Sequence, residues 1–159
     1  MSAPLLELSG RIIIIGGPRC GKSTIARGYL ARGIPIFCGD PAHLVKELED
    51  GVTYLPDDLT WSDGSAYVAR EWFTMPGPWV CEGQIMARAL RKWLHTSPPA
   101  DHIVVLTEHH PKARPTPGQK VMHKAVMTVW GEVAHRFRDI TIHHDSRDHA
   151  HRSSPAAAR

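Results

Sequence analysis

The sequence predicts an α/β fold of three layers, in which helices cover both faces of a parallel sheet of five strands. Two observations support this prediction. Short apolar segments of the strand type alternate along the chain with longer segments of the helix type, as they do in consecutive β-α-β units. The chain has 159 residues, a length that fits one domain with its own hydrophobic core. We expect that domain to span residues 1–144.

The first predicted strand and helix flank a glycine-rich loop. Residues 11–15 are one arginine followed by four isoleucines, and a continuous β-branched segment is typical of a strand that is buried on both faces. Residues 16–21 form the loop. Residues 22–32 place apolar side chains on one side of a helix, and Gly33 is a suitable end for it.

The second predicted strand is followed by a helix start signal. Residues 34–38 are short and apolar, which favours a strand. Asp40 followed by Pro41 is typical of a helix start, with the aspartate as N-cap and the proline in the first turn. We expect this helix to reach about residue 50 and residues 52–61 to be irregular.

The middle of the chain predicts one helix, one strand and a second helix. Ser62 or Asp63 is placed to cap a helix that continues to Met75. Residues 79–81 predict the third strand, and residues 84–94 predict a helix with basic side chains on one face.

The last third of the chain predicts two strands around a long helix. Residues 102–107 form the fourth strand and residues 139–143 the fifth, with a helix over residues 119–137 between them. Residues 108–118 contain three prolines and several charges, and we expect them to form a mobile lid. Residues 145–159 are polar and then alanine-rich, which predicts a disordered tail.

The loop after the first strand carries the strongest motif. Residues 16–23 fit the pattern G-x-x-x-x-G-K-[ST], whose backbone N–H groups surround phosphate oxygens at the start of a helix. Its lysine reaches the β- and γ-phosphates, and its hydroxyl binds Mg²⁺. The other interpretation is a tight strand–helix turn without a ligand. We expect ATP and Mg²⁺ to bind here through Gly16, Gly17, Pro18, Arg19, Cys20, Gly21, Lys22, Ser23 and Thr24.

Two carboxylates follow predicted strands and are candidates for catalysis. Asp40 follows the second strand, where it is placed to accept the proton of an attacking hydroxyl group, although it also suits a purely structural cap. Glu82 ends the third strand, where a carboxylate supports Mg²⁺ or orients the acceptor. A plain acidic residue at a strand end is the alternative for Glu82.

Further candidates extend this site on the acceptor side and on the ATP side. Asp58, Gln84 and Arg88 are candidate acceptor contacts, whereas turn formation and an exposed helix face are their structural alternatives. Lys112 and Arg114 lie in the predicted lid, for which a merely solvated loop is the alternative. A cation in a closing loop stabilises the charge of a transferring phosphoryl group, so we expect Lys112 to contact ATP and Arg114 to assist transfer.

Composition excludes several other classes of protein. The three cysteines have no metal-type spacing and predict reduced thiols rather than disulfides. No apolar segment is long enough to span a bilayer and no signal peptide is recognisable, so we expect a cytoplasmic protein without a membrane partner. The eleven histidines show no zinc-binding pattern, and most of them belong to a basic C-terminal half.

Charge is distributed in blocks along the chain. Residues 1–39 carry five basic and one acidic side chain, residues 40–83 carry two and nine, and residues 84–138 carry nine and three. The basic blocks contain the phosphate loop and the lid, and the acidic block contains Asp40 and Glu82. A basic stretch attracts polyanions such as DNA, with an affinity that depends on salt concentration.

Over about residues 10–144, the chain resembles small P-loop kinases of the nucleotide-kinase type. The resemblance lies in the phosphate loop, the order of the strands, Asp40 and the segment 79–83. Segments 59–62, 77–83 and 88–92 also look like those of short bacteriophage P-loop proteins. Some of these are similar to kinases that phosphorylate hydroxymethyluracil in DNA. The resemblance implies a P-loop kinase fold and the host cytoplasm as location if the protein is phage-encoded.

Two departures from this family bear on the acceptor. Nucleoside monophosphate kinases usually carry an Asp-Gly-x-Pro-Arg run after the third strand, and this chain has Glu82-Gly83-Gln84 instead. Their lid usually carries several arginines, and the lid of this chain has only Lys112 and Arg114 as obvious cations. Both departures favour a hydroxyl group over a phosphate group as acceptor. We therefore expect an ATP-dependent phosphotransferase whose leading acceptor is 5-hydroxymethyluracil in phage DNA, with the nucleotide flipped out of the duplex. The alternatives are a kinase of a free nucleoside, nucleoside monophosphate or other small metabolite, and a nucleotide-binding module without catalysis.

Overall fold

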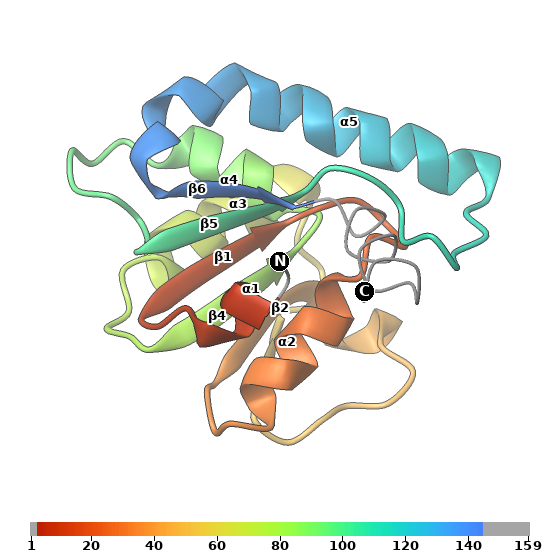
Figure 1. Ribbon diagram of the computed structural model, residues 1–159, viewed down its shortest axis with the longest axis horizontal. Helices are drawn as coiled ribbons and strands as arrows, with labels where there is room; N and C mark the ends of the chain where they lie inside the picture. Colours follow the sequence, from red (N-terminus) through yellow and green to blue (C-terminus); the bar gives the residue numbers. More distant parts are fainter. Residues whose placement is uncertain (1–2, 145–159) are drawn as a thin grey trace, which may run out of the picture.

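The chain folds around a single sheet in which all six strands are parallel. The computed structural model describes residues 3–144, and Figure 1 shows the sheet with helices on both sides. The strands lie in the order β3-β2-β4-β1-β5-β6. Their bounds are β1 Arg11–Ile15, β2 Ile36–Pro41, β3 Val52–Leu55, β4 Trp79–Gly83, β5 His102–Leu106 and β6 Thr141–His144.

Five α-helices and four shorter helical turns connect these strands within the described residues. The α-helices are α1 Ala3–Glu7, α2 Lys22–Leu30, α3 Trp61–Tyr67, α4 Met86–Lys92 and α5 Pro117–Val133. A π-helical segment, Val68–Trp72, continues α3 directly. The 3₁₀ turns are Ala42–Leu44, Ala134–Arg136 and Arg138–Ile140.

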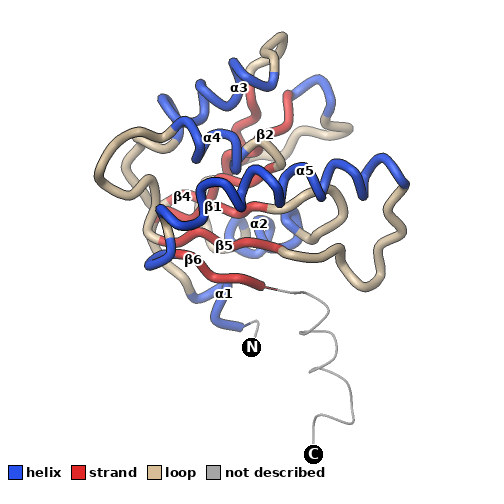
Figure 2. Tube along the Cα trace, turned by 90° about the horizontal axis from the view of Figure 1, so that it is seen from above, coloured by secondary structure: helices blue, strands red, loops and turns tan. Residues whose placement is uncertain are grey.

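The alternation of side chains along β1 divides the core into two halves. Ile13 and Ile15 pack with residues of α4 and α5 on one face of the sheet. Ile12 and Ile14 pack on the other face with α1 and α2, including Tyr29. Figure 2 shows α3, α4 and α5 on one side of the strands and α2 on the other. Since all four isoleucines are buried, the continuous apolar segment reflects two covered faces, and the expected three-layer α/β arrangement is confirmed.

The prediction of five strands was wrong because β3 was expected to be irregular. Val52–Leu55 is only four residues long and ends before Pro56, so its own sequence signal is weak. Pairing with β2 supplies its stability: Ile36 lies opposite Val52 and Cys38 lies opposite Tyr54 in a parallel register. A short edge strand of this kind is specified by its neighbour more than by its own residues.

The helix expected from Asp40 to about residue 50 is absent. Strand β2 continues through Asp40 to Pro41, and only the short turn Ala42–Leu44 follows. A helix here would have no apolar face to bury, since Leu44 and Leu48 are both exposed. The Asp-Pro pair therefore ends a strand in this chain, and Asp40 does not act as a helix N-cap.

The remaining helix boundaries differ by a few residues from those expected. Thr60, rather than Ser62 or Asp63, caps α3 by accepting a hydrogen bond from the backbone N–H of Asp63. Thr116 and Gln119 form a reciprocal capping box at the start of α5. The predicted disordered tail, residues 145–159, lies outside the described residues.

The topology places the carboxyl end of β1 at the centre of the sheet. From β1 the chain builds β2, β3 and β4 on one side and then crosses to β5 and β6 on the other. In open parallel sheets, ligands bind at the carboxyl ends of the strands, at the position where the strand order reverses. Of the helices in residues 3–144, none has the length and apolar character needed to cross a bilayer.

Candidate phosphate-binding and acceptor site

The phosphate-loop motif forms the tight connection between β1 and α2. Helix α2 starts at Lys22, directly after Gly21, which has a left-handed backbone with φ of 93°. Arg19 is also left-handed, with φ of 65°, so two residues of positive φ turn the chain back toward the sheet. No side chain caps α2, which leaves the N–H groups of its first turn available to an anion.

The lysine and the serine of the motif stand at the start of α2. The Lys22 ammonium donates a hydrogen bond of 2.6 Å to the carbonyl oxygen of Gly17, so the lysine folds back over its own loop. Ser23 follows it in the first turn of α2 and is exposed. The motif cation and the motif hydroxyl group are thus consecutive residues in the first turn of α2.

The loop is held from outside by residues that no sequence motif marks. The backbone N–H of Gly17 donates to Nδ1 of His123 in α5, at 3.1 Å. His109 Nδ1 lies 3.0 Å from the carbonyl oxygen of Pro18, and the backbone N–H of His110 donates to the carbonyl oxygen of Arg19 at 2.8 Å. The segment after β5 therefore lies against the phosphate loop.

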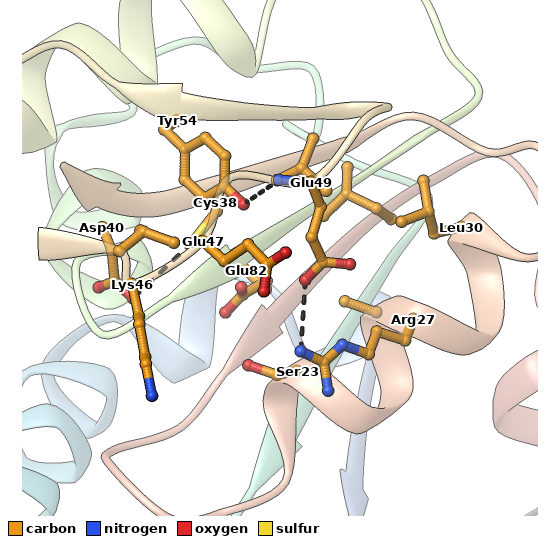
Figure 3. A pocket seen from close by; sticks show the side chains of 14 residues that line it. Ser23, Arg27, Leu30, Cys38, Asp40, Lys46, Glu47, Glu49, Tyr54 and Glu82 are labelled. Atoms are coloured by element: carbon orange, nitrogen blue, oxygen red, sulfur yellow. Dashed lines mark hydrogen bonds and ion pairs between the residues drawn. The ribbon is translucent and has the colours of Figure 1, made fainter. Parts of the chain in front are cut away.

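Ser23, Asp40 and Glu82 line one pocket of about 330 Å³. They come from α2, β2 and β4 respectively, and Figure 3 shows them around the same space. Since these strands are parallel, their carboxyl ends meet at one edge of the sheet, beside the helix that follows the phosphate loop. The two carboxylates selected from sequence are thus brought together with the motif hydroxyl.

The two carboxylates differ sharply in their surroundings. Glu82 is only 6% exposed, and this burial raises the pKa of its carboxyl group, while the charge of Lys22 opposes the rise. Asp40 is exposed at the end of β2. An exposed acid and a buried acid on one pocket are suited to different tasks, proton exchange for the first and fixed orientation for the second.

A thiol lies between these acids. The Cys38 thiol lies 3.8 Å from Oδ2 of Asp40. Burial raises the pKa of Cys38, and the nearby charge of Glu82 raises it further. Cys38 therefore remains a neutral thiol at ordinary pH.

The outer wall of the pocket is formed by the segment that was expected to be helical. Glu49 accepts a hydrogen bond from Arg27 at 3.3 Å, and its backbone N–H donates to the hydroxyl group of Tyr54 at 3.2 Å. Both contacts appear in Figure 3. Lys46 and Glu47 complete this wall. Four carboxyl groups face two cations around the pocket, so its lining is acidic.

Asp58 does not line this pocket. It is exposed and has a left-handed backbone with φ of 68°, which is typical of a turn residue. Its neighbour Asp57 accepts hydrogen bonds from the backbone N–H and from the ring Nδ1 of His43, at 3.2 and 2.7 Å. Asp57 thus joins the segment after β3 to the segment after β2, and Asp58 forms the adjacent turn.

The basic face of α4 is engaged by neighbouring helices. Arg88 lies over the ring of Trp61 at 5.4 Å, and Arg91 pairs with Glu132 of α5 at 3.0 Å. Lys92 donates to the backbone and side-chain oxygens of Ser62. These contacts give the three cations a structural role in joining α3, α4 and α5. Arg88 lies on a different cavity from the one that Ser23, Asp40 and Glu82 line.

That second cavity has a volume of about 250 Å³ and also contains Gln84. Its walls come from Trp61 and from apolar residues of α5, including Met122. The Gln84 side-chain oxygen is buried without a hydrogen-bond partner among the described residues. Glu82 and Gln84 therefore face different cavities at the end of β4.

The predicted lid cations are exposed on the segment that follows β5. The backbone N–H of Lys112 donates to Nδ1 of His110, and the Arg114 guanidinium donates to the adjacent carbonyl oxygen of Ala113. His110 in turn contacts Arg19 of the phosphate loop. Lys112 and Arg114 are therefore carried by a segment that borders the phosphate loop, while both residues remain exposed to solvent.

The donor atoms around the first pocket fit a hard divalent cation that also binds phosphate oxygens. Ser23 supplies a hydroxyl oxygen and Glu82 a carboxylate, and such oxygen ligands suit Mg²⁺, which keeps several water or phosphate ligands. Within residues 3–144, no group of three or more histidine, cysteine, aspartate or glutamate side chains could hold a metal ion by itself.

Comparisons with protein-family models, with curated proteins and with solved structures found no match to this chain.

Proposed function

We propose that the protein is an ATP-dependent phosphotransferase that moves the γ-phosphate to a hydroxyl group of a nucleotide-type acceptor. One observation carries the proposal. The pocket lined by Ser23, Asp40 and Glu82 opens beside the helix that follows the phosphate loop. A donor site for phosphate and a site for a hydroxyl group with its base are thereby adjacent, as in-line transfer requires.

On the donor side, the chain supplies backbone N–H groups and two side chains. The first turn of α2 has no side-chain cap, so its N–H groups are available to the β-phosphate. Lys22 leaves the carbonyl oxygen of Gly17 to reach the γ-phosphate. Ser23 and Glu82 would hold Mg²⁺, which would supply positive charge to the phosphate oxygens. Lys112 and Arg114 approach from the segment beside the loop.

On the acceptor side, Asp40 accepts the proton of the hydroxyl group. The acceptor oxygen forms a bond to the γ-phosphorus, the bond between that phosphorus and the bridging oxygen breaks, and ADP leaves. Asp40 is exposed on the pocket rim, so it releases the proton to water afterwards. General base catalysis of this kind contributes about 10²- to 10⁴-fold to the rate.

The charge of the pocket favours an uncharged acceptor group over a phosphate group. Its lining includes Asp40, Glu47, Glu49 and Glu82, and one of its two cations, Arg27, is already paired with Glu49. A phosphate group would be repelled by this lining, whereas a hydroxymethyl group would not. The resemblance to phage DNA kinases makes 5-hydroxymethyluracil in DNA the leading acceptor, and a free nucleoside is the alternative.

The experiment that tests the proposal compares acceptors in one assay. The protein is incubated with ATP labelled on the γ-phosphate and with DNA that contains 5-hydroxymethyluracil, with unmodified DNA, or with free 5-hydroxymethyldeoxyuridine. We expect label on the modified DNA alone. Label on the free nucleoside alone selects the alternative acceptor. A preparation that binds ATP and labels none of these or of a wider panel of hydroxyl compounds contradicts the proposed activity.

The matched control is the variant Lys22→Ala, purified in the same way. It loses the cation of the phosphate loop while keeping the fold, since Lys22 is only partly buried. Labelling that is as strong in this variant as in the wild type comes from a contaminating kinase.

A further inference from the structure

We propose that His123 is a positioning residue that fixes the phosphate loop in its nucleotide-binding shape by accepting the backbone N–H of Gly17. The inference rests on the proposed function. It extends that function to a residue of helix α5 that lies 106 positions after Gly17 and outside the motif. His123 lies in α5 and is 9% exposed, one of three polar or charged residues buried in the described part of the chain.

Two polar contacts determine which ring nitrogen of His123 carries the proton. Nδ1 lies 3.1 Å from the backbone nitrogen of Gly17, which can only donate, so Nδ1 must be the acceptor. Nε2 lies 2.9 Å from the carbonyl oxygen of Thr107, which can only accept, so Nε2 must carry the hydrogen. The structure therefore assigns the neutral Nε2–H tautomer to His123.

Cys20 agrees with this assignment. Its sulfur lies 3.3 Å from the same Nδ1 atom, and burial raises the pKa of the thiol above its ordinary range. The single hydrogen of the protonated thiol can go to Nδ1 or to the carbonyl oxygen of Pro18, 3.7 Å from the sulfur, so the thiol contact does not require a proton on Nδ1. A proton on Nδ1 would instead face the Gly17 N–H, and the loop would lose this contact.

Close packing makes the contact specific. A methyl group at Gly17 would overlap the backbone of His123, so the glycine is required for α5 to approach the loop. The ring of His109 lies 4.8 Å from the ring of His123 between centroids, and His109 also contacts Pro18. The charges of Lys22 and Glu108 both act on the Cys20 thiol of this cluster. The imidazole thus joins the phosphate loop, the end of β5 and α5.

A hydrogen bond to the Gly17 N–H constrains the phosphate loop near its first residue. Gly17 is the second residue of the motif, and Lys22 bonds to its carbonyl oxygen. Fixing the peptide nitrogen of Gly17 also fixes the start of the loop whose later N–H groups face the phosphates. Loss of His123 should therefore weaken ATP binding and leave the acceptor pocket, which it does not line, unaffected.

The test uses variants that keep or remove one contact at a time. In His123→Asn the side-chain oxygen takes the place of Nδ1, so the Gly17 contact is kept and the Thr107 contact is lost. His123→Ala loses both contacts. His135→Ala, at an exposed histidine after α5, is the control. The dissociation constant of ATP, the KM of the acceptor and the melting temperature are measured for each protein.

We expect the ATP dissociation constant of His123→Ala to rise about tenfold, which corresponds to about 1.4 kcal/mol. His123→Asn should recover most of this loss, and the acceptor KM should not change in any variant. The proposal is overturned if His123→Ala binds ATP as the wild type does, or if His123→Asn binds as weakly as His123→Ala.

A second measurement is independent of catalysis. A long-range ¹H–¹⁵N spectrum of the wild-type protein reports the protonation of both ring nitrogens of His123, and we expect the Nε2–H tautomer. A proton on Nδ1 overturns the positioning role whether or not the protein transfers phosphate. Conversely, the expected tautomer with intact ATP binding and no phosphoryl transfer overturns the proposed function and leaves the role of His123 standing.

Discussion

Cys38 and Glu82 occupy paired positions on the neighbouring parallel strands β2 and β4. This register places a buried thiol next to a buried carboxyl group, two residues before Asp40 emerges at the end of β2. Glu82 is also in register with Ile14, near the end of β1. The sheet therefore aligns the acids of two strands with the start of the phosphate loop.

Replacing Asp40 by asparagine should lower the turnover number by about 10²- to 10⁴-fold, because the hydroxyl proton loses its acceptor. The affinity for ATP should remain close to that of the wild type, since Asp40 lies on the acceptor side. Transfer rates and ATP titrations check both statements. Asp58→Asn, at an exposed turn, serves as the control and should keep full activity. A fully active Asp40→Asn would remove Asp40 from the role of base.

Replacing Glu82 by glutamine should abolish Mg²⁺-supported transfer and make the fold more stable near pH 7. Burial raises the pKa of Glu82, so the native state binds its proton more tightly than the unfolded state does. Wild-type stability should then decrease as the pH rises above the ordinary glutamate range of about 4.3, and this decrease should be smaller in the variant. Denaturant unfolding without added metal, at several pH values, checks the sign. An equally steep decrease in both proteins would contradict it.

Replacing Lys22 by alanine should weaken ATP binding by at least about tenfold, because one charge-assisted contact to the phosphates is lost. Lys46→Ala removes a cation of the pocket wall that lies outside the loop, and it is the matched control. Calorimetric titration with ATP and Mg²⁺ distinguishes the two. Equal losses in both variants would mean that general positive charge, rather than the lysine of the loop, accounts for the affinity.

The three thiols should react slowly in the native protein. Cys20, Cys38 and Cys81 are buried and free, and burial is the first cause of the raised pKa of each. Since thiolate is the reactive form, we expect reaction with Ellman's reagent about two orders of magnitude slower than after unfolding in guanidinium. Release of three equivalents after unfolding, but not before, would support this. One rapidly reacting thiol in the native state would contradict it.

Replacing Asp101 by alanine should destabilise the fold without changing the site. Asp101 accepts a hydrogen bond from the backbone N–H of Arg11 at 2.8 Å and pairs with the guanidinium at 3.3 Å. The backbone bond, followed by the side-chain bonds, lowers the pKa of Asp101. Because the pair is partly exposed to solvent, the loss at neutral pH should be about 1 kcal/mol or less.

The sign of the pH dependence follows from that lowered pKa. The stabilisation by Asp101 is present above the ordinary aspartate pKa of about 3.9 and disappears as the pH falls through the lower native value. Unfolding curves of wild type and Asp101→Ala should therefore differ at pH 7 and converge in acid. Because Arg11 starts β1 at the edge of the sheet opposite the pocket, phosphoryl transfer should be unchanged.

Local sequence signals predicted the parts of the fold in which each segment suffices to specify its own structure. The isoleucines of β1 have no polar alternation, so both faces must be covered. Residues 16–23 combine glycines, a lysine and a serine at fixed spacing, and they lie between a buried strand and a helix as the motif requires. The histidine-rich composition, in contrast, suggested only a basic half, because spacing along the chain does not show which rings meet.

By itself, the sequence determined the layered α/β arrangement, the buried central strand and the position of the phosphate loop, since hydrophobic burial and backbone freedom act over a few neighbouring residues. Only the tertiary structure decided what depends on partners distant in the chain. Strand β3 is stabilised by its pairing with β2. Residues 45–49 have no apolar face to bury as a helix, and they form part of the pocket wall instead. His123 reaches Gly17 because α5 packs on one face of the sheet with its first turns beside the end of β5.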